Sequence, residues 1–161
     1  VKFNSANDLE KIQQNRRVRP LNMSGLRRLY AAILREEDII VRAAFLMLIY
    51  GFASRSKIFS MAWSDLDFNH YMWNGRPLTN RAIVLLQDLP QDGGWVFPSH
   101  GGMHLVDPRT AWKRVVSAAG IPDLTMDDVY KFLMRRVVWA SDTEGLRDNL
   151  NDLLDQVLMD V

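Results

Sequence analysis

The order of apolar and polar residues along the chain predicts a series of helices with little sheet. Apolar positions recur at helical spacing from Ser24 to Arg35, and the residues from Ile39 to Tyr50 are apolar on nearly every side. The first pattern is typical of an amphipathic helix capped by Ser24, and the second is typical of a buried central helix that ends at Gly51.

The remaining helices are predicted from caps, breakers and apolar spacing. They cover residues 5–14, 55–62, 79–89, 107–119, 125–139 and about 144–161. The last of them has one continuous apolar stripe and starts with capping-box spacing between Ser141 and Glu144. Residues 68–76 form at most a small strand pair around Asn74-Gly75. The fold class is therefore mainly α, with a reduced β-hairpin region.

Composition limits the class of protein without naming its function. The chain has 161 residues, enough for one sizeable core, and no cysteine, which excludes disulfides, thiol catalysis and cysteine-ligated zinc. The start is polar and no apolar run reaches the length of a membrane span, so we expect a cytoplasmic protein with no membrane contact. A first residue of Val in place of Met indicates a fragment of a longer chain.

Charge is distributed unevenly although the net charge is only +1. Residues 1–35 hold eight Lys/Arg against two Asp/Glu, a net of +6, whereas residues 141–161 hold one Arg against six acids, a net of −5. The basic N-terminal part favours contact with a polyanion, and the acidic C-terminal part favours a different role. Solvated helix faces would give the same pattern.

Five short blocks stand out along the chain: LIYGFASRSKIFSMAWSDLD from Leu48 to Asp67, Pro77-Leu78 with the helix that follows, Val96-Phe97-Pro98-Ser99, AWKRVVSAAG from Ala111 to Gly120, and Leu124-Thr125. In their order and spacing they resemble the catalytic domain of the tyrosine recombinases, the phage-integrase family, in which the last of these blocks leads into the second catalytic box. The resemblance covers about residues 20–140. It implies a recombinase-like helical domain of prokaryotic or phage origin, linked by ancestry to DNA integration.

The family cuts and rejoins DNA by phosphoryl transfer, in which a tyrosine hydroxyl attacks a DNA phosphate and forms a covalent link that a second strand end then reverses. Two arginines clamp the phosphate during these steps. At the positions that match, this chain departs from the pattern. The first catalytic Arg falls on Ser54, with Arg55 one place away as a possible substitute. The His and the second Arg of the second box fall on Asp127 and Tyr130, and only Lys131 keeps a basic character.

Two further parts of the family's machinery are missing. The hairpin that carries its catalytic Lys is reduced to about ten residues without a Lys, and no Tyr follows Tyr130, although the family's nucleophile comes well after the second box. We therefore expect an integrase-like domain that is catalytically inactive and binds DNA. An active recombinase with relocated residues is the least favoured alternative.

The predicted organisation is a basic connector over residues 1–19 followed by the degenerate catalytic domain over residues 20–161. The basic residues predicted to contact the DNA backbone are Arg16, Arg17, Arg19, Arg27, Arg28, Arg55, Lys57, Lys113, Arg114, Lys131, Arg135 and Arg136.

The C-terminal helix supports another possibility, a protein-interaction module. In the family, the C-terminal segment packs onto a neighbouring protomer, so the striped helix over 144–161 could exchange between copies and make a homo-oligomer. Folding back onto its own domain is the favoured alternative. His100 and His104 with Asp107 lie in a glycine-rich loop, which argues against a metal site, and no cofactor is expected.

Overall fold

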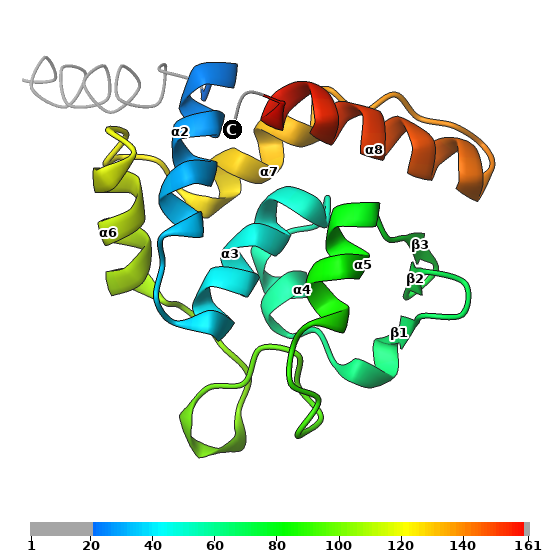
Figure 1. The fold of residues 1–161 in the computed structure, drawn as a ribbon, viewed down its shortest axis with the longest axis horizontal. Coiled ribbons are helices and arrows are strands. Elements are labelled where there is room, and N and C mark those ends of the chain that lie inside the picture. The colour runs from blue at the N-terminus through cyan, green and yellow to red at the C-terminus, as the bar shows by residue number, and fades with distance from the viewer. Residues whose placement is uncertain (1–20, 160–161) are drawn as a thin grey trace, which may run out of the picture.

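The computed structural model describes residues 21–159 and is mainly helical (Figure 1). The α-helices of this part are α2 (Met23–Leu34), α3 (Ile39–Tyr50), α4 (Arg55–Phe59), α5 (Asn80–Gln87), α6 (Arg109–Ala118), α7 (Met126–Met134) and α8 (Thr143–Leu158). Short 3-10 turns, η1 (Trp63–Asp65) and η2 (His100–Gly102), lie between them. The helix predicted over 5–14 and the connector over 1–19 lie outside the described residues.

Helix α3 is the centre of the domain, as its apolar sequence predicts. Its residues from Ala43 to Tyr50 are all buried, and α2, α4, α5 and α7 pack around it. The carboxylate of Asp38 caps its first turn by accepting hydrogen bonds from the backbone of Ile40 and Val41. It ends at Gly51, where a Cβ atom would lie 2.8 Å from the carbonyl oxygen of Met47.

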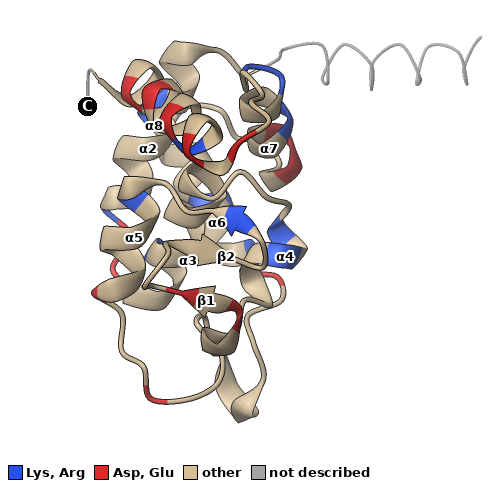
Figure 2. Ribbon diagram, turned by 90° about the vertical axis from the view of Figure 1, so that its right-hand side faces the viewer, with Lys and Arg blue, Asp and Glu red and all other residues tan. Residues whose placement is uncertain are grey.

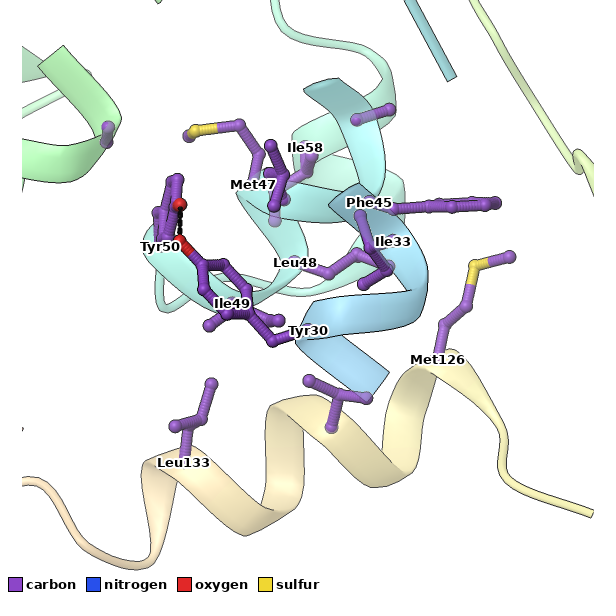
Figure 3. Packing of buried hydrophobic residues seen from close by; sticks show 14 of the residues in the cluster. Tyr30, Ile33, Phe45, Met47, Leu48, Ile49, Tyr50, Ile58, Met126 and Leu133 are labelled. Carbon is purple, nitrogen blue, oxygen red and sulfur yellow. Dashed lines mark hydrogen bonds between the residues drawn. The ribbon is translucent and has the colours of Figure 1, made fainter. Parts of the chain in front are cut away.

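Helix α2 starts two residues earlier than predicted, because its cap is Asn22 rather than Ser24. The Asn22 side chain accepts a hydrogen bond of 2.7 Å from the backbone of Gly25, so an amide supplies the acceptor expected from a hydroxyl. The buried face of α2 meets α3 in Figure 3, where the hydroxyls of Tyr30 and Tyr50 are joined by a hydrogen bond of 2.6 Å.

The strand region is slightly larger than predicted. Strands β1 (Leu66–Asp67), β2 (Met72–Trp73) and β3 (Arg76–Pro77) form a three-stranded antiparallel sheet in which Leu66 pairs with Trp73 and Trp73 with Arg76. The expected hairpin is the β2–β3 pair, and Asn74 and Gly75 both have positive φ in its turn. The extra strand β1 was missed because two residues give no readable alternation.

The segment between α5 and α6, predicted to be extended at 95–97, has isolated bridges at Trp95 and Pro98 and bends at the two residues between them. Trp95 pairs with Ala62, the backbone of Val96 donates to the carbonyl of Met61, and Val96 and Phe97 are buried. This pairing ties the loop to the turn that follows α4. Helices α5 and α6 occupy the predicted ranges to within a few residues.

Helix α7 ends at Met134, five residues before the predicted end at Trp139. The β-branched Val137 and Val138 are weak helix formers, and the amide of Asn149 on α8 donates a hydrogen bond of 2.7 Å to the carbonyl of Val138. The chain therefore leaves the helix and runs beside α8. Trp139, expected inside a helix, lies in an irregular connector with 65 % of its surface exposed.

Helix α8 packs on its own domain, against α2 and β3 (Figure 1). The apolar stripe faces inward through Leu150, Leu153, Leu154, Val157 and Leu158, which are all buried. The predicted Ser141–Glu144 capping box is wrong: Asp142 is the cap, and its carboxylate accepts a hydrogen bond of 2.8 Å from the backbone of Gly145.

None of the helices in residues 21–159 has the length and apolar character needed to cross a membrane.

Candidate nucleic-acid interface

The two segments predicted to match the recombinase catalytic boxes lie next to each other. Ser54 directly precedes α4, Asp127 and Tyr130 belong to α7, and α4 packs against α7. In Figure 2 the Lys and Arg positions of α4 and of the α7 region lie on the same side of the molecule, whereas the acidic positions of α8 lie on another. We call the surface formed by α4, α7 and residues 135–136 the α4–α7 face.

The side chains at the box positions do not form a phosphate clamp. Ser54 is close only to another hydroxyl, with its Oγ 3.3 Å from that of Ser56. The Asp127 carboxylate forms an ion pair with the Lys131 ammonium at 3.0 Å. Both side chains are exposed, and the two residues lie one helical turn apart. A phosphate placed there would face a carboxylate whose neighbouring cation is already paired, which opposes binding.

The two acids at the start of α7 have a structural explanation. The Asp128 carboxylate accepts a hydrogen bond from the backbone of Thr125, and the Thr125 hydroxyl accepts one from the backbone of Asp128, so the two residues form a capping box. Asp127 lies in the same first turn, where a negative charge interacts favourably with the helix dipole. One of these acids, Asp127, lies at the position predicted to match the His of the family's second box.

Arg55 points toward an acid of the loop before α6. Its Nη1 atom lies 3.8 Å from Asp107, and the same carboxylate accepts a hydrogen bond of 2.9 Å from Arg109. Both arginines remain largely exposed, so each stays accessible to a ligand. The pair with Asp107 nevertheless reduces the positive potential that Arg55 contributes.

Two of the predicted DNA contacts hold the domain together instead. The guanidinium of Arg27 donates to the carbonyls of Val157 and Gln156, both at 3.1 Å, and so binds the C-terminal end of α8. Arg114 donates to the carboxylate of Glu36, whose side chain is only 4 % exposed. Burial alone would raise the pKa of Glu36, but the hydrogen bonds from the Asp38 backbone and from Arg114 outweigh it and leave that pKa below its usual value.

Arg136 is also partly engaged. Its guanidinium lies 3.7 Å from the centre of the Phe132 ring, and it donates a hydrogen bond of 2.9 Å to the carbonyl of Phe132. Its outer edge is exposed, so it can still meet a phosphate.

Four predicted contacts make no ion pair or side-chain hydrogen bond with any residue in 21–159, and all four are exposed. They are Arg28, Lys57, Lys113 and Arg135. Lys57 and Arg135 belong to the α4–α7 face, while Arg28 and Lys113 belong to α2 and α6, which pack together elsewhere. Arg16, Arg17 and Arg19 lie outside the described residues.

The histidines of the glycine-rich loop make local contacts. Nδ1 of His104 lies 2.7 Å from the carbonyl of Leu105, and its ring packs edge-on against Trp95 at 4.9 Å. Over residues 21–159, no three His, Cys, Asp or Glu side chains gather as a ligand set for a metal.

Arg147 is an important residue that the sequence did not single out. From the partly buried side of α8 it donates to the carbonyls of Leu78, His70 and Tyr71 at 3.0–3.2 Å, which fixes the β-sheet region to α8. No spacing rule could have found it, because its acceptors are backbone atoms about 70 residues away.

Comparison with known proteins finds no match among family models, curated proteins or solved structures. The relationship to the tyrosine recombinases therefore stays a prediction from the sequence.

Proposed function

We propose that the protein is a catalytically inactive, recombinase-like domain whose α4–α7 face binds the phosphates of the DNA backbone. The observation that carries the proposal is the packing of α4 against α7, which brings the segments matching the two catalytic boxes together. The exposed cations Lys57 and Arg135 lie on this face, with Arg55 and Arg136 partly available beside them.

The same face argues against catalysis. A tyrosine recombinase needs a nucleophile and a pair of arginines around one phosphate, and here Ser54, Asp127 and Tyr130 stand at the arginine and histidine positions. Tyr130 is partly buried on α7 and has no base bonded to its hydroxyl among residues 21–159. Binding without strand cleavage is the function that these side chains support.

The test is fluorescence anisotropy of the full chain with a labelled duplex, at salt concentrations from about 50 to about 200 mM. We expect affinity to fall steeply with salt and to be similar for unrelated sequences, because phosphate contacts carry no base information. Lys57→Glu and Arg135→Glu should each weaken binding and reduce the slope of log K against log salt by about 1 or more.

Lys113→Glu is the matched control, since it makes the same charge change at an exposed lysine on α6. A much smaller effect of this variant would locate the contact on the α4–α7 face. Equal effects of all three variants would contradict that location, and no binding at the lowest salt would refute DNA binding. A covalent adduct with a nicked duplex would instead support an active recombinase.

A further inference from the structure

The connector between α7 and α8 presents an unusual apolar surface. Val138 and Trp139 are adjacent, and 68 % and 65 % of their surfaces are exposed. The hydrogen bond from Asn149 to the Val138 carbonyl fixes this pair beside α8. Two adjacent exposed apolar side chains offer a contact surface for another apolar group.

The outer face of α8 beside this pair is strongly acidic, as Figure 2 shows. Glu144, Asp148 and Asp152 are exposed and form no ion pair with any residue in 21–159, unlike Asp155, which lies 3.5 Å from Arg81. The surface therefore fits an occupant that combines apolar and basic side chains.

We propose that residues 1–19 of the same chain are this occupant. The segment holds five Lys/Arg against two Asp/Glu, and its apolar residues include Phe3, Leu9 and Ile12. Its basic side chains would meet the carboxylates of α8 while an apolar residue covers Trp139. DNA is a poor alternative because three carboxylates repel phosphate, and a second copy that presented the same face would bring acid against acid.

The geometry of the described residues allows the contact within one chain. Arg27 on α2 holds the carbonyls of Gln156 and Val157, so the start of α2 lies near the end of α8. From Val157 back to Asn149 is eight residues, or about 12 Å along the helix. Residues 9–20 span about 16 Å even if fully helical and about 40 Å if extended, so Leu9 and Ile12 can reach Trp139.

Such a contact has a consequence for DNA binding that rests on the proposed function. The carboxylates of α8 and the phosphates of DNA would compete for Arg16, Arg17 and Arg19. DNA would therefore have to displace the α8 carboxylates from these arginines. A tethered segment competes at an effective concentration in the millimolar range. The acidic helix would then weaken nonspecific binding and make it less dependent on salt, because salt also weakens the contact that competes with DNA.

The absence of cysteine allows a direct test by distance measurement between spin labels. Labels at Ser5→Cys and Ser141→Cys report on the contact, and Ser5→Cys with Ser117→Cys on α6 is the matched control. We expect a short, narrow distance for the first pair in low salt, which lengthens and broadens at about 1 M NaCl, where the Debye length is about 3 Å. The double variant Asp148→Lys, Asp152→Lys should show the same broadening of the distance between positions 5 and 141 in low salt. Trp139→Ala should broaden this distance to a smaller extent.

The substitutions at Ser117, Trp139, Ser141, Asp148 and Asp152 are at exposed positions. Unchanged circular dichroism and an unchanged unfolding midpoint will show that each variant keeps the fold. A broad distance between positions 5 and 141 that neither salt nor charge reversal changes would overturn the proposal. A short distance found only between two singly labelled chains would also overturn it, in favour of contact with a second copy. No DNA is present in this experiment, so its failure is separate from failure of DNA binding.

Discussion

The docking of α8 can be tested by removing one buried side chain. Leu154 lies in the middle of the apolar stripe and is fully buried. Leu154→Ala removes three carbon atoms from a close-packed site, and changes of this kind cost about 2–5 kcal/mol through lost burial and the cavity that remains. In a domain of this size, each kcal/mol lowers the Tm by roughly 2–4 °C, so we expect a fall of about 5–20 °C.

The assay is thermal unfolding followed by circular dichroism, repeated over a wide range of protein concentration. Leu34→Ala on α2 is the matched control, because it is the same substitution at a leucine that is 44 % exposed, and it should change stability by about 0.5 kcal/mol. If α8 covers its own domain, the Tm of the native chain and of both variants will not depend on concentration.

Two results would refute the reasoning. A Tm that rises with protein concentration would show that α8 exchanges between copies, which is the oligomerisation expected as an alternative from the sequence. A Leu154→Ala variant as stable as Leu34→Ala would show that α8 is not part of the cooperative unit at all.

Three further predictions follow from single sites. The pKa of Glu36 is lowered in the folded state, so the stabilisation that its carboxylate provides is complete above the ordinary pKa of 4.5 and is lost as the pH falls below that value. Urea unfolding at several pH values should therefore show that Glu36→Gln costs about 1–3 kcal/mol near neutrality and progressively less below pH 4.5. Burial and the hydrogen bond with Tyr30 raise the pKa of Tyr50, so an ultraviolet titration should show that Tyr50 ionises only when the protein unfolds in alkali. Tyr50→Phe should cost about 1–2 kcal/mol because it leaves the Tyr30 hydroxyl poorly partnered. Gly120 has φ +76° with Arg28 close to the position of its missing Cβ, so Gly120→Ala should lower stability by about 1 kcal/mol in denaturant unfolding, whereas Gly93→Ala, with open space around it, should not; equal effects would contradict the conformational reason.

The parts of the fold that were predicted well are those with strong local signals. The apolar run of α3, the Asn74-Gly75 turn and the stripe of α8 each specify one structure through residues close in sequence. The end of α7 was predicted wrongly because it depends on a contact with Asn149, eleven residues from Val138. Local periodicity contains no information about a hydrogen bond to a neighbouring helix, so Trp139 was assigned to the helix and its exposure was missed.

Candidate sites were harder to predict because the function of an arginine depends on which acceptor lies within its reach. Arg27 and Arg28 are neighbours on one helix and have the same charge, yet Arg27 holds the end of α8 while Arg28 forms no side-chain hydrogen bond or ion pair with any residue in 21–159. The planar guanidinium offers five donors, which suits free carbonyls at a helix end as well as it suits a phosphate.

The predicted DNA contacts differ in what it would cost each side chain to bind a phosphate. A guanidinium already bonded to internal carbonyls would have to give up those bonds to reach a phosphate, and this cost falls on Arg27 and on Arg147, which binds three carbonyls. Lys57 and Arg135 lose nothing of this kind with the described residues and keep their full charge for a ligand. Substituting Arg27 would lower stability and so reduce binding indirectly, whereas only substitutions such as Lys57→Glu, which leave the fold intact, can show whether the α4–α7 face meets DNA.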